Sequence, residues 1–215
     1  MKFAVVGLGL FGKKLARELA EQDHEVLAID RDEEPVTAVQ DDVSKAVIGD
    51  VTQEGLLDEL VTEEFDAVIV TMATDLEASL LSVLHAKEIG VKDILAKSNG
   101  PKHTTILKRL GIQNIISPEE DVAEQLAEKI GNPKVHEYMQ FQNGHSIAEM
   151  KVPDEFVGQT LRELNLRDEH GIQVIGIQRA GSGEIDYVPS PSVPFEDEDV
   201  IWVTGPEDVL KDFSR

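Results

Sequence analysis

The 215-residue sequence contains no cysteine, which excludes disulfide bonds, thiolate metal sites and cysteine nucleophiles together. Aromatic residues are scarce, at 5%, so aliphatic side chains must form most of the core. No apolar run approaches the roughly 18 residues that a membrane-spanning helix requires. The N-terminus enters an apolar run directly, with no signal-peptide cleavage region. We therefore expect a cytoplasmic protein.

Positive charge is also in short supply. The sequence contains 20 Lys and Arg residues but 42 Asp and Glu residues, which gives a net charge of −22. A field of this sign repels nucleic acid and anionic lipid headgroups, so we expect neither as a partner. The charge is compatible with simple solubility or with a specific basic partner, and it says little about the fold.

Short apolar runs alternate with amphipathic segments over residues 1–130. Nearly continuous apolar runs are typical of parallel strands that are covered on both faces. Their alternation with helical patterns predicts a doubly wound parallel sheet. The predicted strands comprise residues 2–8, 25–30, 45–50, 66–72, 93–99 and 114–118.

The pattern changes after the last helix of this region, which the sequence ends at Gly131. Residues 131–143 are predicted as a linker, and residues 144–215 as a small α+β domain of its own. Within it we expect a strand at 145–152, one short helix at 160–171, two strands joined at 180–183, and a strand followed by a helix at 199–213. A domain of this size is too small to be the catalytic domain of an ordinary dehydrogenase.

The segment "GLGLFG" places Gly7, Gly9 and Gly12 in G-x-G-x-x-G spacing, after a strand and at the start of a helix. The first glycine permits a tight turn, the second lets a pyrophosphate approach the backbone, and the third lets the helix lie close to the strand. Asp30 ends the next strand, where a carboxylate accepts hydrogen bonds from ribose hydroxyls and repels a 2′-phosphate. The pattern favours NAD or ATP over NADP. Alternatively, the glycines form a simple turn and Asp30 is a surface acid. The adjacent Arg31 either contacts the adenine or is exposed to solvent.

The sequence offers no residue set for catalysis. Its six histidines show no spacing that pairs one of them with an acid or a metal, and we expect most of them at the surface. A small NAD-dependent oxidoreductase is the alternative, and it would need an acid or base beside the nicotinamide. A redox-sensing repressor would need a basic face for DNA, which an evenly acidic chain lacks. A protein that binds a nucleotide without turning it over is therefore favoured.

The order and spacing of these segments resemble the TrkA and KtrA family, the cytoplasmic regulatory subunits of bacterial potassium uptake systems, with an RCK N-domain and an RCK C-domain. The resemblance covers nearly the whole chain. It rests on "VVGLGLFG", "LAIDRDEE", "VIGDVTQE", "DAVIVTMATDLEASLL", "LAKSNGPKH", "LGIQNIISPEEDVAEQLA" and "FVGQTLRELNLRDEHGIQVIGI". The implied fold is α/β, a Rossmann-like doubly wound parallel sheet followed by a small α+β domain.

The resemblance implies a regulatory role rather than a catalytic one. In such proteins, bound NAD(H) or ATP/ADP sets the shape of a homo-oligomeric ring, built from dimers into an octamer or tetramer. The ring gates a membrane potassium-translocating subunit of the TrkH or KtrB type. Apolar residues on helix 75–90 and on the next helix are candidates for the dimer contact, or are simply buried within one chain.

The implied nucleotide site follows the ends of the first five strands. Residues 50–52 would border the adenine, residues 71–73 would line the pocket, and Lys97 would lie near the phosphates. The full set is Gly7, Leu8, Gly9, Leu10, Phe11, Gly12, Asp30, Arg31, Asp50, Val51, Thr52, Thr71, Met72, Ala73 and Lys97.

Two positions bear on which ligands would bind there. Glu119 matches an acid that holds a divalent cation against the nucleotide phosphates in some relatives, although it also reads as a first-turn helix acid favoured by the helix dipole. Leu10 stands where several ATP-responding relatives have arginine, and leucine cannot contact a γ-phosphate as a bidentate donor. We therefore expect ATP and ADP to bind with similar affinity.

The resemblance also implies a cyclic dinucleotide between two copies of the C-terminal domain. The three apolar residues at matching positions could equally be packing residues. The matching positions are Leu161, Asn165, Arg167, Ile175 and Pro189.

Overall fold

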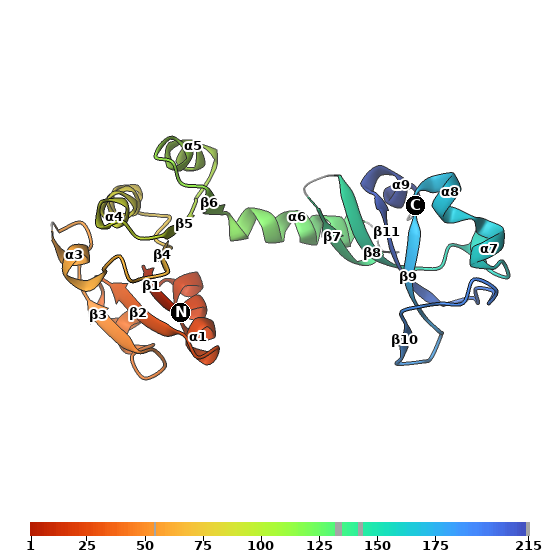
Figure 1. Ribbon diagram of the computed structural model, residues 1–215, viewed down its shortest axis with the longest axis horizontal. Coiled ribbons are helices and arrows are strands. Elements are labelled where there is room, and N and C mark those ends of the chain that lie inside the picture. The colour runs from red at the N-terminus through yellow and green to blue at the C-terminus, as the bar shows by residue number, and fades with distance from the viewer. Residues whose placement is uncertain (54, 132–134, 142–143, 214–215) are drawn as a thin grey trace. The chain divides into compact units, whose positions relative to one another are not determined.

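Residues 1–118 form a six-stranded parallel sheet with helices on both faces in the computed structural model (Figure 1). The strand order is β3-β2-β1-β4-β5-β6. This is the order of a doubly wound dinucleotide-binding sheet, so the predicted fold class is confirmed. The strands are β1 (Lys2–Val6), β2 (Glu25–Asp30), β3 (Lys45–Ile48), β4 (Ala67–Val70), β5 (Asp93–Lys97) and β6 (Asn114–Ile116).

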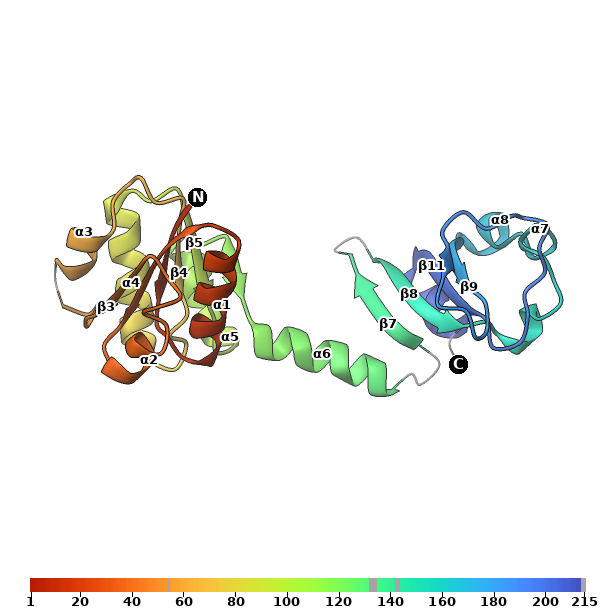
Figure 2. The ribbon, with the colours of Figure 1, turned by 90° about the horizontal axis from the view of Figure 1, so that it is seen from below.

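Helices cover both faces of this sheet, and successive residues of each strand point to opposite faces. In β1, Val5 packs in one apolar cluster with Ala16 and Val36, whereas its neighbour Val6 packs in another with Leu57 and Leu107. Figures 1 and 2 show the helices on the two faces. They are α1 (Leu10–Glu21) and α2 (Glu33–Thr37) on the first face, and α3 (Leu56–Leu60), α4 (Leu76–Ile89) and α5 (Pro101–Arg109) on the second.

The longest of these helices, α4, has a defined start and end. The Asp75 side chain accepts a hydrogen bond from the backbone N–H of Ala78 at 3.1 Å and so caps the first turn. Gly90 ends the helix with a φ of 85°, as its position in the sequence predicts. The five-residue helix α2 was not predicted, because it is too short to show an amphipathic period.

A second compact unit begins at Glu119, so the two units comprise Met1–Pro118 and Glu119–Arg215. The structure describes residues 1–53, 55–131, 135–141 and 144–213. The second unit contains an antiparallel sheet of order β10-β9-β11-β8-β7. Its elements are α6 (Pro118–Gly131), β7 (Val135–Gln140), β8 (His145–Lys151), the 3-10 turn η1 (Asp154–Phe156), α7 (Leu161–Leu164), α8 (Leu166–His170), β9 (Gln173–Gln178), β10 (Ile185–Asp186), β11 (Val200–Pro206) and α9 (Glu207–Phe213).

This α+β unit was predicted, but three of its details differ from expectation. The predicted linker contains strand β7, which pairs with β8; an edge strand is bonded on one side only and therefore tolerates the polar residues that concealed it. The predicted single helix at 160–171 is divided by Asn165, whose φ of 43° is left-handed. The second strand of the predicted pair shrinks to the two-residue β10. The domain boundaries at residues 130 and 144 stay a prediction.

None of the helices in the described part of the chain is long and apolar enough to cross a membrane.

One buried carboxylate anchors the segment that connects β9 to β11 and contains β10. Asp199 is fully buried, and its Oδ2 accepts hydrogen bonds from Arg179 Nη1 and, at 2.9 Å, from the backbone N–H of Glu196. Its Oδ1 accepts from the backbone N–H of Ala180 at 3.2 Å. Arg179 also donates to the carbonyl of Pro194 at 3.1 Å. Asp199 therefore holds both ends of the loop that closes this sheet.

We expect Asp199→Ala to destabilise the second unit by about 2 to 3 kcal/mol, because it leaves a guanidinium and two backbone N–H groups without their acceptor. Trp202 on β11 is the only tryptophan, so its fluorescence during urea unfolding reports this unit. The control is Asp197→Ala, because that side chain is 73% exposed. Equal unfolding midpoints for the two variants would contradict the role of Asp199.

Candidate functional site

The turn between β1 and α1 lies where the order of the sheet reverses. Strand β1 is flanked by β2 and β4, so its carboxyl end is the point at which ligands bind in doubly wound sheets. Gly7 follows β1 with a φ of 95°, a left-handed conformation that glycine adopts without strain. Its backbone N–H donates to the carbonyl of Ile29 at 2.8 Å. The first glycine therefore forms the tight turn that the sequence predicts.

The third glycine of the motif is required by the packing of the protein itself. A Cβ atom on Gly12 would lie 2.0 Å from the carbonyl oxygen of Gly7 and 2.7 Å from Oγ1 of Thr71. The Thr71 hydroxyl, directly after β4, donates a hydrogen bond to the same Gly7 carbonyl at 2.5 Å. The turn, helix α1 and the end of β4 thus meet at one carbonyl oxygen.

The second glycine has a different environment. A Cβ atom on Gly9 would meet nothing within 4 Å, and its φ of −62° suits any residue. Among the described residues, no side chain caps α1, and its first turn contains no acidic residue. The positive end of the helix dipole therefore faces an open space beside Gly9, which is the arrangement that binds phosphate groups.

Asp30 lies beside this turn, as predicted. The carboxylate is half-buried at the end of β2, and its Oδ2 accepts a hydrogen bond from the backbone N–H of Leu8 at 2.5 Å. Its Oδ1 accepts from the backbone N–H of Asp32 at 3.0 Å. The side chain of Leu8 is fully buried, so this residue meets the site through its backbone. The role of Asp30 toward ribose stays a prediction.

The residues directly after β3 include a second carboxylate at the end of a strand, that of Asp50. Asp50 Oδ1 accepts hydrogen bonds from the Thr52 hydroxyl at 2.7 Å and from the Thr52 backbone N–H at 3.0 Å. These two bonds, with a smaller effect of the Arg31 charge, hold the pKa of Asp50 below its ordinary value, so this carboxylate is ionised at neutral pH. Between them in the chain, Val51 is buried in the apolar core.

The predicted residues on the other side of the turn lie at the ends of β4 and β5. Thr71 and Ala73 are buried, and Met72 is half-buried. The ammonium group of Lys97 lies 5.6 Å from the centre of the Phe11 ring, in the first turn of α1. This contact brings a cation to the helix end that faces the open space. Leu10, at the start of the helix, is 89% exposed.

Asp75 is a residue of this edge that the sequence analysis missed. Its Oδ2 accepts a hydrogen bond from Arg31 Nη1 at 3.3 Å while its Oδ1 caps α4. Its position directly before an apolar helical run is the signal of an N-cap, but nothing in the sequence indicates the ion pair.

The remaining predicted site residues lie in the second unit. Glu119 is exposed in the first turn of α6, and the described residues contain no cluster of three or more His, Asp or Glu that could hold a metal within one chain. Leu161 packs against the core of the second unit, in line with a packing role. Asn165 and Arg167 are exposed, whereas Ile175 and Pro189 are half-buried.

One histidine departs from the expected surface position. His103 on α5 is 3% exposed, and its Nε2 lies 3.3 Å from the hydroxyl of Ser79 on α4. Burial lowers the pKa of His103, so the ring is neutral at physiological pH. This pair joins two helices within the core and does not form a catalytic set.

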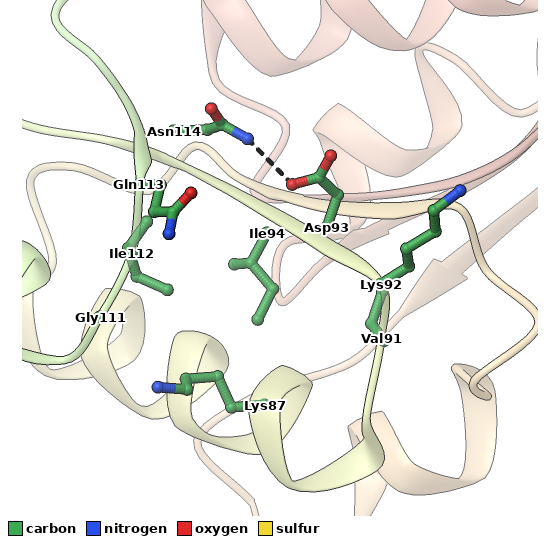
Figure 3. Close-up of a pocket in the computed structure, with 9 residues that line it drawn as sticks. All are labelled: Lys87, Val91, Lys92, Asp93, Ile94, Gly111, Ile112, Gln113 and Asn114. Carbon is green, nitrogen blue, oxygen red and sulfur yellow. Dashed lines mark hydrogen bonds between the residues drawn. The ribbon is translucent and has the colours of Figure 1, made fainter.

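A pocket of about 320 Å³ lies at the opposite edge of the sheet, between the ends of α4 and α5 and the starts of β5 and β6 (Figure 3). Three of its polar side chains, those of Lys87, Asp93 and Asn114, already have hydrogen-bond partners within the protein. Lys87 donates to the carbonyl of Leu110, and Asn114 donates to Asp93 at 2.9 Å across the rim that Figure 3 shows. The pocket is a gap between two helix ends, away from the edge of the sheet at which the parallel strands end.

Comparison with known proteins matches both parts of the chain to one family. Residues 3–118 match the sequence model of the TrkA-N domain, and residues 147–215 match that of the TrkA-C domain. The chain is 35% identical to the Ktr system potassium uptake protein C of Bacillus subtilis (strain 168), covering 95% of this chain and 91% of that protein. It is also 35% identical to the Ktr system potassium uptake protein A of Vibrio alginolyticus, covering 97% of this chain and 94% of that protein.

A solved structure of similar fold is the GsuK channel bound to NAD. It superposes with a TM-score of 0.61 at 16% identity, covering 97% of this chain and 38% of the channel chain. This chain therefore spans well under half the length of that channel chain, and the likeness shows the fold alone.

The two glycines after Gly7 allow a matched test of the turn. We expect Gly12→Ala to destabilise the first unit by about 3 kcal/mol or to prevent its folding, because the added methyl group overlaps the Gly7 carbonyl. Gly9→Ala should change stability by less than about 1 kcal/mol yet weaken nucleotide binding at least about tenfold, because its methyl group occupies the space that a pyrophosphate needs.

Thermal unfolding and calorimetric titration with NAD and ADP measure the two effects. Similar losses of stability in both variants, or full affinity in Gly9→Ala, would contradict this assignment of roles.

Proposed function

The chain belongs to the TrkA/Ktr family of potassium uptake proteins, and from this we propose that it is a nucleotide-sensing regulatory subunit that gates a membrane potassium-translocating protein. The observation that carries the proposal is a family match that extends over both domains and nearly the full length of the relatives. The oxidoreductase alternative has no comparable support, because the relatives are named as potassium uptake proteins.

The proposed ligand is NAD(H) or ATP/ADP, bound at the carboxyl edge of the first sheet. Support comes from the open space beside Gly9 at the uncapped start of α1, and from a channel of similar fold that is described as bound to NAD. The phosphates would lie against the turn and near Lys97, with Asp30 toward the ribose. Because the exposed side chain at the start of α1 is Leu10 rather than a cation, ATP and ADP should bind with similar affinity.

The proposed partners are further copies of this chain and a membrane subunit of the TrkH or KtrB type, which would place the protein at the cytoplasmic face of the membrane. Several large apolar side chains are exposed, as an assembling protein requires. On α6 they recur every four residues and so form one stripe. The exposed apolar side chains on these three helices are Leu76 and Leu84 on α4, Ile106 on α5, and Val122, Leu126 and Ile130 on α6. Assembly into an octameric or tetrameric ring is part of the proposal.

Two further ligands belong to this proposal. Glu119 would complete a divalent-cation site together with nucleotide phosphates at a contact between subunits. The exposed residues Asn165 and Arg167 would face a cyclic dinucleotide bound between two C-terminal domains. Calorimetry with Mg²⁺ in the presence of ADP, and with cyclic di-AMP alone, tests each separately.

Potassium uptake provides the direct test of the function. The gene would be expressed with a Ktr-type membrane subunit in a bacterial strain that lacks its own potassium uptake systems, and growth would be measured at limiting potassium. We expect growth only when both proteins are present. Growth that is equally good with the membrane subunit alone, or turnover of NADH by the purified protein, would overturn the proposal.

Asp30 should contribute more to nucleotide affinity than any other side chain, because its hydrogen bonds to ribose are charge-assisted and partly desolvated. We expect Asp30→Ala to weaken binding by about 2 kcal/mol, or roughly thirtyfold. Isothermal titration with NAD, NADH, ATP and ADP measures the loss.

The control for Asp30→Ala is Glu21→Ala, which removes one carboxylate from the far end of α1. Its affinity should stay within about twofold of the wild type, because exposed charges separated by more than a Debye length are screened. An unchanged affinity in Asp30→Ala would place the site elsewhere.

A further inference from the structure

Arg31 stands among carboxylates from three elements at the nucleotide edge. It follows Asp30 in the chain, and its Nε lies 4.0 Å from Oδ2 of Asp32. Its Nη1 lies 3.3 Å from Oδ2 of Asp75, at the start of α4. Arg31 is also close enough to Asp50, after β3, for its charge to influence that carboxyl group. One exposed guanidinium therefore pairs with the carboxylates of Asp32 and Asp75 and also influences that of Asp50.

The carboxylate of Asp75 is fixed by a second hydrogen bond that does not involve Arg31. Its Oδ1 accepts the capping hydrogen bond from the N–H of Ala78 at 3.1 Å, which leaves Oδ2 directed to the guanidinium. Exposed ion pairs usually contribute little, partly because two flexible side chains must be ordered. Here the cap has already ordered one of them, so Asp75 is a fixed acceptor that draws Arg31 toward α4.

The position of this pair matters for the ribose. In doubly wound sheets the acid that ends the second strand faces the 2′-hydroxyl, and an arginine nearby accommodates a 2′-phosphate when the ligand is NADP. Arg31 stands next to that acid and would be the natural donor to such a phosphate. In this protein the guanidinium is hydrogen-bonded to Asp75. The neighbouring carboxylates carry negative charge, as a phosphate dianion does, and therefore repel it.

We propose that Asp75 is a specificity-determining residue, which holds Arg31 toward α4 and so excludes nucleotides that carry a 2′-phosphate, such as NADP(H). The inference rests on the proposed function, because it concerns the same nucleotide site. It assigns selectivity against NADP to a residue outside the glycine motif and outside the strand that carries Asp30.

The variant Asp75→Asn separates the ion pair from the cap. Asparagine caps helices about as well as aspartate, so α4 keeps its start while Arg31 loses its charged partner. Glu77→Gln, in the first turn of the same helix, changes the net charge by the same amount and is the matched control. The double variant Arg31→Gln/Asp75→Asn removes the donor as well.

Calorimetric titrations of each protein with NAD and NADP give the result, and thermal unfolding confirms that the variants are folded. We expect wild type to prefer NAD by at least about tenfold, because the carboxylates repel the added phosphate. Asp75→Asn should reduce this preference by about threefold or more, through tighter binding of NADP, in keeping with the strength of one exposed ion pair. Glu77→Gln should leave the preference unchanged, and the double variant should restore it.

An unchanged preference in Asp75→Asn, or an equal change in Glu77→Gln, would overturn the inference, as would a wild type that binds NADP as tightly as NAD. A second pair of ligands, ADP and its 2′-phosphorylated derivative, gives the same ratio if only the mononucleotide binds. Failure of every nucleotide to bind any of the folded proteins would instead contradict the proposed nucleotide site itself.

Discussion

At Gly12, helix α1 lies so close to the turn after β1 that a single methyl group would overlap the Gly7 carbonyl, at 2.0 Å. The same carbonyl accepts the hydroxyl of Thr71, so the first and fourth strands are joined at the point where the strand order reverses. Asp30 adds a bond from the second strand to the N–H of Leu8. Three neighbouring strands are thus fixed around one turn. The open start of α1 and the carboxylate of Asp30 keep their relative positions only while this contact holds.

A chain with a net charge of −22 must separate its charges locally if it is to bind the proposed anionic nucleotide. The side proposed for the phosphates has a positive potential from the uncapped start of α1 and from Lys97, whose ammonium group lies over the Phe11 ring. The side proposed for the ribose carries the carboxylates of Asp30, Asp50 and Asp75. This division matches the ligand, because phosphates carry the negative charge of a nucleotide whereas the ribose hydroxyls are neutral donors.

The sequence predicts the first unit well because its signals are local. Continuous apolar runs indicate the six parallel strands, and the glycine spacing together with Asp30 indicates the edge at which they end. The second unit is predicted less completely for physical reasons. Strand β7 lies at the edge of its sheet and needs few apolar residues, and the helix at 160–171 is broken by the backbone of Asn165, which adopts a φ that few residues other than glycine favour.

Individual contacts of the site join residues that are far apart in the chain, so the sequence alone does not predict them. The pairing of Arg31 with Asp75 joins residues 44 positions apart, and its existence depends on how α4 starts relative to β2. His103 is buried because α5 places it against Ser79. The spacing of the histidines in the sequence does not predict this contact. In each case the residue type is visible in the sequence while its partner is set by tertiary packing.

A ligand changes the equilibrium between two assemblies only through a difference in its affinity for them. In the proposed function, an element that begins at the proposed nucleotide site and exposes apolar surface along its length is suited to transmit such a difference. Helix α4 has these properties, because Asp75 begins it beside Arg31 while Leu76 and Leu84 expose apolar surface farther along. The strands are less suited to this role, since their side chains are buried on both faces and packed cores do not deform continuously. A rigid shift of α4 against the sheet would move its exposed residues together, which would give the proposed nucleotide a direct mechanical route to the proposed contacts between subunits.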